Sequence, residues 1–84
     1  MYRIEFVKKA VKQFKTLSSQ EQKRIKAKID TLANEPRPNG VVKLSGKDNL
    51  YRIRVGDYRI IYSIKDTQLL ILVVKIGNRR DVYR

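Results

Sequence analysis

In the first part of the chain, the spacing of hydrophobic residues changes from every second position to every third or fourth. Apolar and polar residues alternate through YRIEFV, which predicts a short strand with Tyr2, Ile4 and Phe6 on one side. From residue 7 onward, apolar residues recur every three or four positions, which predicts a helix. The expected apolar stripe of this helix is Val7, Ala10, Val11, Phe14 and Leu17.

A second helix is predicted to begin in the segment SSQEQ. Either Ser18 with Glu21 or Ser19 with Gln22 fits a capping box, in which side chain and backbone satisfy each other's unpaired groups. Pro36 ends this helix, and EPRPNG is predicted to be a loop. The apolar residues expected to face the core are Ile25, Ile29, Leu32 and Ala33.

The second half of the chain reads as strands and turns. VVKL is predicted to be a short extended segment and SGKDN a turn, followed by strands near residues 50–55 and 58–65. KDT predicts a further turn. Residues 68–76 are apolar at successive positions, which is typical of a strand that is buried on both faces near the centre of a sheet.

The stretch VGDY fits a two-residue hairpin turn between the two middle strands. Gly56 can take the positive φ that a tight primed turn requires. This register places Arg54 opposite Arg59 and Arg52 opposite Ile61, on one face of the hairpin. The other face, expected to pack on the helices, carries Tyr51, Ile53, Val55, Tyr58, Ile60 and Tyr62. We interpret these tyrosines as core or core-edge residues rather than platforms for stacked bases.

The predicted order of elements is β-α-α-β-β-β, in one domain that spans residues 1–84. We expect an α+β fold in which two antiparallel helices pack on one face of a curved, mostly antiparallel sheet. Two helices cannot cover both faces of the sheet, so the arginine face is expected to be open. Like charges directly opposite each other destabilise a sheet. Either solvent alone screens these arginines, or they bind an anion.

Charge is the strongest compositional signal. The 84 residues include 20 Lys and Arg against 8 Asp and Glu, for a net charge of +12 and a pI near 10.3. The apolar fraction of 42% is nevertheless that of a folded domain. A compact protein this basic attracts polyanions, so nucleic acid is the first candidate partner and an acidic protein the second. A membrane surface comes only third, because no predicted helix combines a strong apolar face with aromatic anchors.

The composition also excludes several kinds of site. The chain has no cysteine and no histidine, which removes disulfides, the usual zinc sites and Ser-His catalysis. The N-terminal MYRIEF has no apolar signal core, and the longest apolar run, LLILVV, is too short to span a bilayer. We therefore expect a cytoplasmic protein that uses neither a metal nor a cofactor and has no membrane partner.

The segments KLSG, LYRIRVGDYRIIYSI and VVKIGNRRDVYR resemble the RelE toxins of type II toxin–antitoxin systems, in the RelE/ParE superfamily. This resemblance covers the whole chain and implies the RelE-like α+β fold, which is similar to that of small microbial ribonucleases. It implies a metal-free endoribonuclease that binds in the ribosomal A site and cuts mRNA there by attack of a 2′-hydroxyl on the phosphate. It also implies neutralisation by a cognate acidic, RelB-like antitoxin.

The resemblance assigns catalytic roles residue by residue. The basic positions of the YRIR strand and of the YR that follows are arginines, and the C-terminal GNRRDVY supplies a further arginine and a tyrosine. The catalytic residues that it implies are Arg52, Arg54, Arg59, Arg79 and Tyr83. The further residues expected to contact nucleic acid are Lys43, Arg80 and Arg84.

The chain departs from the pattern of the family in two ways. Arg52 and Arg54 stand where some relatives have lysine, and Asn78 stands where many close relatives have histidine. An arginine cannot readily act as a general base, because its pKa lies above about 12. Tyr83 is therefore assigned the role of base or proton shuttle, because neighbouring cations favour its phenolate form.

Two other functions remain open on the sequence. A ParE-like inhibitor of DNA gyrase would share the fold and the antitoxin. A non-catalytic basic nucleic-acid-binding protein would share the charge, and the Asn78 change could mark such a relative that has lost its activity.

Overall fold

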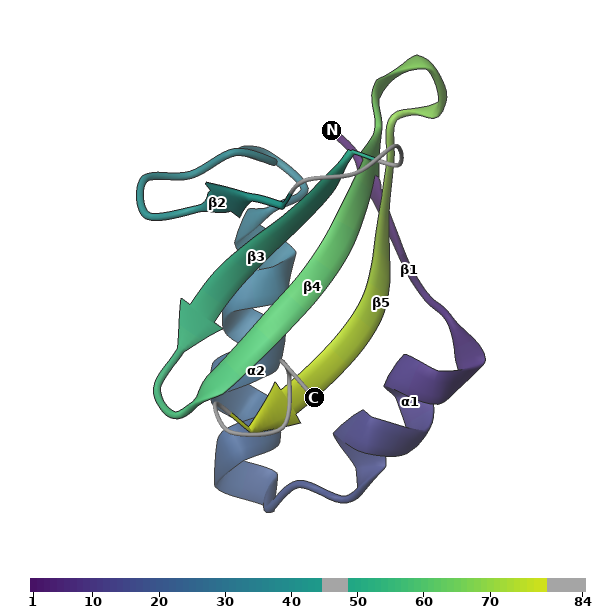
Figure 1. Ribbon diagram of the computed structural model, residues 1–84. Helices are drawn as coiled ribbons and strands as arrows, with labels where there is room; N and C mark the ends of the chain where they lie inside the picture. The colour runs from purple at the N-terminus through teal and green to yellow at the C-terminus, as the bar shows by residue number, and fades with distance from the viewer. Residues whose placement is uncertain (45–48, 79–84) are drawn as a thin grey trace.

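The computed structural model describes residues 1–44 and 49–78, and in them two helices pack against a five-stranded sheet (Figure 1). The elements are β1 (Arg3–Phe6), α1 (Lys8–Lys15), α2 (Ser19–Thr31), β2 (Val42–Lys43), β3 (Leu50–Val55), β4 (Tyr58–Lys65), the 3-10 helix η1 (Asp66–Gln68) and β5 (Leu70–Asn78). The predicted α+β class is confirmed. The segment VVKL, predicted only to be extended, contributes the additional strand β2.

The strands of the sheet follow the order β1-β5-β4-β3-β2. β1 pairs with β5 in parallel, and the other three pairs are antiparallel. β5 therefore lies inside the sheet, as its apolar sequence predicts, and Ile71 and Val73 are fully buried. β5 begins at Leu70 rather than at residue 68, because η1 occupies residues 66–68 and Leu69 has a left-handed backbone with φ of 50°.

The start of α2 shows which of the two predicted capping boxes forms. The Glu21 N–H donates to Ser18 Oγ at 3.2 Å, and the Ser18 N–H donates to Glu21 Oε1 at 3.2 Å. Gln22 has a different role, because its side-chain amide donates to the carbonyl oxygens of Phe14 and Leu17 and so joins α2 to the end of α1. No helix in residues 1–44 and 49–78 has both the length and the apolar character needed to cross a bilayer.

The hydrophobic core lies between the helices and one face of the sheet, with α2 behind the sheet in Figure 1. The predicted core residues Ile25 and Ile29 of α2 are confirmed as buried, as are Leu32 and Ala33, which directly follow it. Ala10 of α1 is fully buried. Val11 was predicted on the same stripe but is 36% exposed. It borders an open apolar groove with Phe6, Phe14 and Ile29, because α1 is short and leaves this side of the core uncovered.

A polar cluster fastens the loop after α2 to the sheet. Arg37 Nη2 lies 2.9 Å from Asp66 Oδ2, and Arg37 Nε donates to the Tyr51 hydroxyl at 3.1 Å. The Tyr62 hydroxyl donates to the Pro36 carbonyl oxygen at 2.7 Å. The rings of Tyr51 and Tyr62 stack in the core, which confirms their predicted structural role.

Candidate functional site

The β3–β4 hairpin has the predicted register. Arg54 pairs with Arg59, and Arg52 pairs with Ile61. Gly56 has a φ of 59°, as a primed turn requires at its first central residue. Residues directly opposite each other lie on the same side of an antiparallel sheet, so the register places all three arginines on one face.

We call this side, opposite the helices, the arginine face. Tyr51, Ile53 and Ile60 on the other side are buried against the helices. On the arginine face Arg54 is exposed, and Arg52 and Arg59 are half-buried. The predicted separation of the two faces is therefore confirmed.

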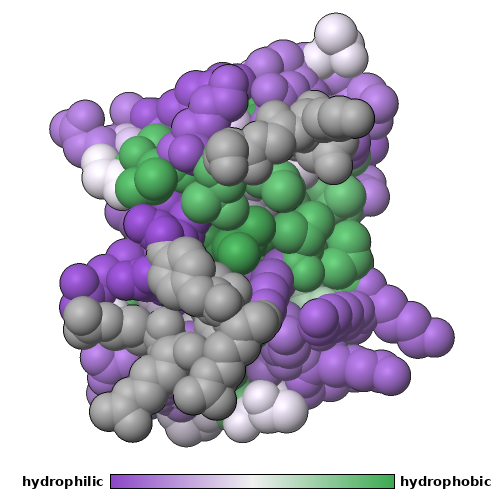
Figure 2. Space-filling view, in the orientation of Figure 1, coloured by the Kyte–Doolittle hydropathy of each residue, from purple (hydrophilic) through white to green (hydrophobic). Residues whose placement is uncertain are grey.

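The arginine face also has an apolar part that the sequence analysis did not emphasise. Figure 2 shows hydrophobic residues gathered near its centre, with hydrophilic residues around them. Leu50, Ile61 and Leu72 are half-buried on this side of β3, β4 and β5. The arginines thus border an apolar surface, which suits a ligand that has both an anionic backbone and flat apolar groups.

Arg54 is held beside the hairpin turn. Its Nε donates to the Gly56 carbonyl oxygen at 3.1 Å, and its Nη groups find no acceptor among the described residues. A guanidinium has five N–H donors in a rigid fork that matches phosphate. This anchored guanidinium can therefore receive an anion without first having to be ordered.

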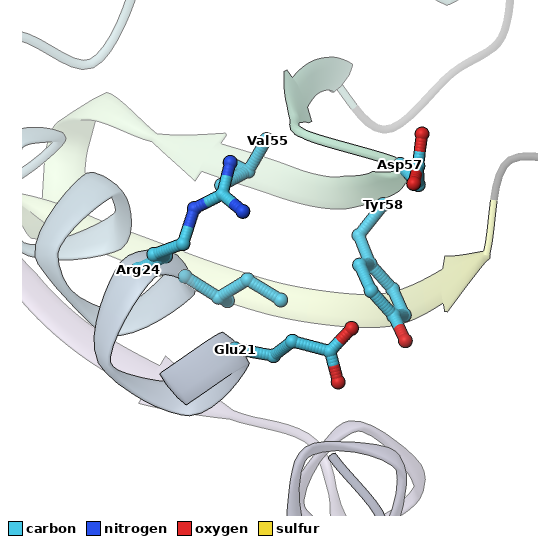
Figure 3. A pocket seen from close by; sticks show the side chains of 6 residues that line it. Glu21, Arg24, Val55, Asp57 and Tyr58 are labelled. Carbon is cyan, nitrogen blue, oxygen red and sulfur yellow. The ribbon is translucent and has the colours of Figure 1, made fainter. Parts of the chain in front are cut away.

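A second polar cluster lies on the helix side of the same turn (Figure 3). Tyr58 points from β4 toward Glu21 of α2, and Arg24 lies over the turn. Hydrogen bonding with Tyr58 is the main cause that lowers the pKa of Glu21, and the same interaction raises the pKa of Tyr58. Tyr58 is thus a core-edge residue, as predicted, and the cluster ties the hairpin to the start of α2.

Not every predicted site residue joins the arginine face. Lys43 pairs with Tyr51 and therefore lies on the helix side at the edge of the sheet, away from Arg52. Its neighbour Val42 pairs with Arg52 instead. Four predicted residues lie outside the described residues, namely Arg79, Arg80, Tyr83 and Arg84.

The sequence analysis did not assign Lys75, a basic residue close to the arginines, to this face. Lys75 pairs with Ile61 and so lies on the arginine face. The apolar run of β5 hid it, because that strand was expected to be apolar on both sides. No local pattern indicates the side of Lys75, because the shift of register between β4 and β5 sets it.

The described residues offer no group of three or more carboxylate, histidine or cysteine side chains that could hold a metal ion. The cations that the register brings together are instead suited to binding an anion. Chemically, the arginine face can bind phosphate groups and stabilise negative charge that develops on them.

Comparison with known proteins identifies the family. The model of the ParE toxin of type II toxin–antitoxin systems matches residues 4–83. The toxin RelE3 of Methanocaldococcus jannaschii is 34% identical, with 96% of this chain and 94% of the relative covered. The chain belongs to the RelE family of toxins, within the RelE/ParE superfamily.

The solved structures agree with this RelE assignment. A chain of the archaeal RelE–RelB complex from Pyrococcus horikoshii OT3 is 36% identical and superposes with a TM-score of 0.85, covering 96% of this chain and 98% of that one. The mRNA interferase toxin RelE of Escherichia coli K12 is 28% identical over 98% of this chain and 90% of its own. The chain is thus a RelE toxin of the toxin–antitoxin class, as its sequence motifs predicted.

Proposed function

We propose that this RelE-family toxin is an endoribonuclease that cleaves mRNA. The observation that carries the proposal is the arginine face, where Arg52, Arg54 and Arg59 lie together on the side of the sheet opposite the helices. A relative from Escherichia coli bears the name mRNA interferase toxin. The net charge of +12 suits a polyanionic substrate.

The proposed reaction is attack of a ribose 2′-hydroxyl oxygen on the adjacent phosphorus. A bond forms between the 2′-oxygen and phosphorus while the bond from phosphorus to the 5′-oxygen breaks, which leaves a 2′,3′-cyclic phosphate and a 5′-hydroxyl. Negative charge grows on the non-bridging oxygens during this step. Arg52, Arg54, Arg59 and Arg79 would stabilise that charge, because fixed guanidinium groups need no reorganisation. The reaction needs neither a metal nor a redox cofactor.

The 2′-hydroxyl must lose its proton in this step. Arg52 and Arg54 stay protonated at neutral pH and cannot accept it. We assign this role to Tyr83, because cations near it in the sequence, such as Arg80 and Arg84, would favour its phenolate form. The proton passes to Tyr83 and then to the leaving 5′-oxygen or to solvent.

We place the substrate in the A site of the ribosome, and hence the toxin in the cytoplasm. The family resemblance implies this site, and the strongly basic surface suits a target built largely of RNA. The ribosome would hold the mRNA in a fixed conformation, so the small toxin would need to supply only charge and proton transfer.

We propose an acidic, RelB-like antitoxin as the partner that neutralises the toxin in a heteromeric complex. The Pyrococcus horikoshii relative was solved as a RelE–RelB complex. In this chain the strong positive charge favours an acidic partner, and β1 and β2 are edge strands whose backbone groups can pair with another chain.

The test is cleavage on programmed ribosomes. Purified toxin should cut mRNA in the A site and leave a 2′,3′-cyclic phosphate, and the same mRNA without ribosomes should remain largely intact. An mRNA with a 2′-deoxyribose before the scissile phosphate should not be cut, because it lacks the nucleophile. Cleavage of that substrate would refute the proposed reaction.

Inhibition of DNA gyrase is the second candidate, because the matching family model is that of the ParE toxin. A supercoiling assay with purified gyrase separates the two functions. Inhibition of supercoiling without cleavage on ribosomes would favour the gyrase inhibitor, and failure in both assays would favour a non-catalytic nucleic-acid-binding protein.

A further inference from the structure

Lys75 and Arg52 belong to one row, meaning a set of residues that pair directly across β3, β4 and β5. Arg52 pairs with Ile61 on β4, and Ile61 pairs with Lys75 on β5. Neighbouring strands lie about 4.8 Å apart, so the backbones of Arg52 and Lys75 are separated by about 10 Å. Both side chains are half-buried on the arginine face and long enough to approach one small anion between them.

The next row places Arg59 beside the same position. It runs from Arg54 through Arg59 to Gly77. Lys75 is two residues before Gly77, which makes it the diagonal neighbour of Arg59, about 7–8 Å away and within reach of long side chains. Gly77 contributes no side chain, so β5 places no side chain directly opposite Arg59. The two rows contain no acidic residue.

A β-bulge in β5 is what turns Lys75 toward this face. Tyr62 pairs with Val73, but Ile61 pairs with Lys75, so one residue of β5 is skipped. With regular pairing Lys75 would lie opposite Ile60, on the core side. The bulge instead places Ile76 in the core, where its N–H donates to the Gln13 side chain at 2.8 Å. Bulges often re-aim a side chain beside an active site.

We propose that Lys75 is a further substrate-contacting residue, whose ammonium group binds an RNA phosphate together with Arg59. This assignment rests on the proposed function and deepens it. Positions 52 and 54 carry arginine, and a lysine adds a compact point charge that complements the planar guanidinium forks. Lys75 also supplies an amine to the site, where the basic residues that match the family pattern are all arginines.

The experiment measures binding of a single-stranded RNA that carries 2′-deoxyribose at the scissile position and cannot be cleaved. Lys75→Gln should weaken binding about tenfold at low salt, since it removes a charged hydrogen bond. The slope of log K against log salt should become shallower by about 0.7, the value for one phosphate contact on a single strand. Lys75→Arg should keep the parent slope, because it keeps the charge.

Lys65→Gln is the matched control. Lys65 is half-buried and lies on the same face, but it pairs with Leu70 at the far end of β4. Lys65→Gln should change the slope of log K against log salt much less than Lys75→Gln does. Equal effects of the two variants would show that Lys75 contributes only general charge and would overturn the proposal. Melting temperatures of all variants show whether any loss of binding reflects unfolding.

Cleavage on programmed ribosomes, measured in parallel, separates this proposal from the proposed function. If Lys75→Gln binds RNA like the parent, Lys75 is not a phosphate contact, whatever the parent cleaves. If the parent cleaves no mRNA while Lys75→Gln still loses affinity and slope, the phosphate contact stands and the nuclease proposal fails. If the parent does not bind the RNA at all, the assignment of Lys75 is refuted.

Discussion

At the residue scale, the opposition of Arg54 and Arg59 is the most informative feature. Two like charges face each other across the hairpin, at a cost in stability that an uncharged pair would avoid. Arg54 is anchored to the Gly56 carbonyl, and Arg59 is half-buried at the centre of the proposed site. An anion bound between them would relieve the repulsion, which connects the unfavourable pair to the proposed binding of phosphate.

Arg59→Ala should abolish cleavage and leave the domain folded. The core packs through the other face of β4, and removing one facing cation should stabilise the hairpin by a few tenths to about 1 kcal/mol. Cleavage on programmed ribosomes and chemical denaturation measure the two effects. Arg3→Ala is the control, because Arg3 lies opposite Leu70 on the same face and pairs with Glu5 at 2.7 Å. Unfolding of Arg59→Ala would show that this arginine has a structural role.

Tyr83→Phe tests the assigned base, because it keeps the ring and removes only the hydroxyl. Ribosome affinity should stay near that of the parent, while the single-turnover cleavage rate should fall by roughly 10²–10⁴. The ionisation of the phenol should also disappear from the pH profile of the rate. If Tyr83 only stacks on a base, Tyr83→Phe should cleave normally, and Tyr83→Ala should weaken binding by about 1–3 kcal/mol.

Gly56, in the turn between β3 and β4, lies against the Arg24 side chain of α2. Its replacement should destabilise the protein for two reasons. Its φ of 59° strains any other residue, at a cost of about 1–3 kcal/mol. An added Cβ would also lie 2.9 Å from Arg24 Nη2. Gly56→Ala should therefore lower the free energy of unfolding, and the loss should shrink by a few tenths of a kcal/mol in an Arg24→Ala background, measured by denaturation in a double-mutant cycle.

Gly40→Ala is the control for that cycle. Gly40 also has a positive φ, 88°, but among the described residues no heavy atom beyond Gly40 and its chain neighbours lies within 4 Å of an added Cβ. The loss of unfolding free energy caused by Gly40→Ala should be the same in the parent and in the Arg24→Ala background. If Arg24→Ala reduced the loss of stability equally for Gly56→Ala and Gly40→Ala, Arg24 would affect stability generally and not through its contact with the turn.

At the element scale, η1, the loop after α2 and the start of β1 are held by one carboxylate. The Tyr2 hydroxyl donates to Asp66 Oδ1 at 2.6 Å, and Arg37 binds the other oxygen. These partners, Arg37 first, hold the pKa of Asp66 below its usual value of 3.8. The same carboxylate raises the pKa of Tyr2.

The Asp66 cluster predicts a loss of stability in acid. Because the pKa of Asp66 is lower in the folded state, the unfolded state binds more protons in the pH range around and between the two pKa values. The stabilisation is therefore complete above the unfolded pKa and is lost as the pH falls through the folded pKa. Melting temperatures measured from pH 6 down to about pH 2 should show this decline. Asp66→Asn should have a shallower profile, with the remaining acid sensitivity due in part to Glu21, whose pKa is also lowered.

At the scale of the whole molecule, the charge of +12 should govern association. Affinity for ribosomes should fall steeply as salt rises, because each phosphate contact releases counterions. Binding measured from low to physiological salt, with the buffer otherwise fixed, gives the slope. A constant affinity over that range would mean that the charge serves solubility and not RNA recognition.

Local sequence patterns were sufficient to predict the alternation of elements, the hairpin register and the separation of the two faces of the hairpin. Gly56 fixed the turn, and a period of two then assigned the side of every residue in β3 and β4. The capping alternatives at Ser18 and Ser19 were equivalent in sequence. The end of α1 decided between them, because Phe14 and Leu17 offered carbonyl oxygens to Gln22.

The positions of Lys43 and Lys75 depend instead on how the strands pair in the folded sheet. Lys43 lies on the helix side because β2 pairs with β3 in a register that no local pattern of a two-residue strand could specify. Lys75 faces the arginines because a bulge shifts β5 by one residue, and a shift of one residue exchanges the two faces of a strand. Local periodicity assigns sides within a strand, whereas pairing between strands far apart in the chain depends on how the core packs.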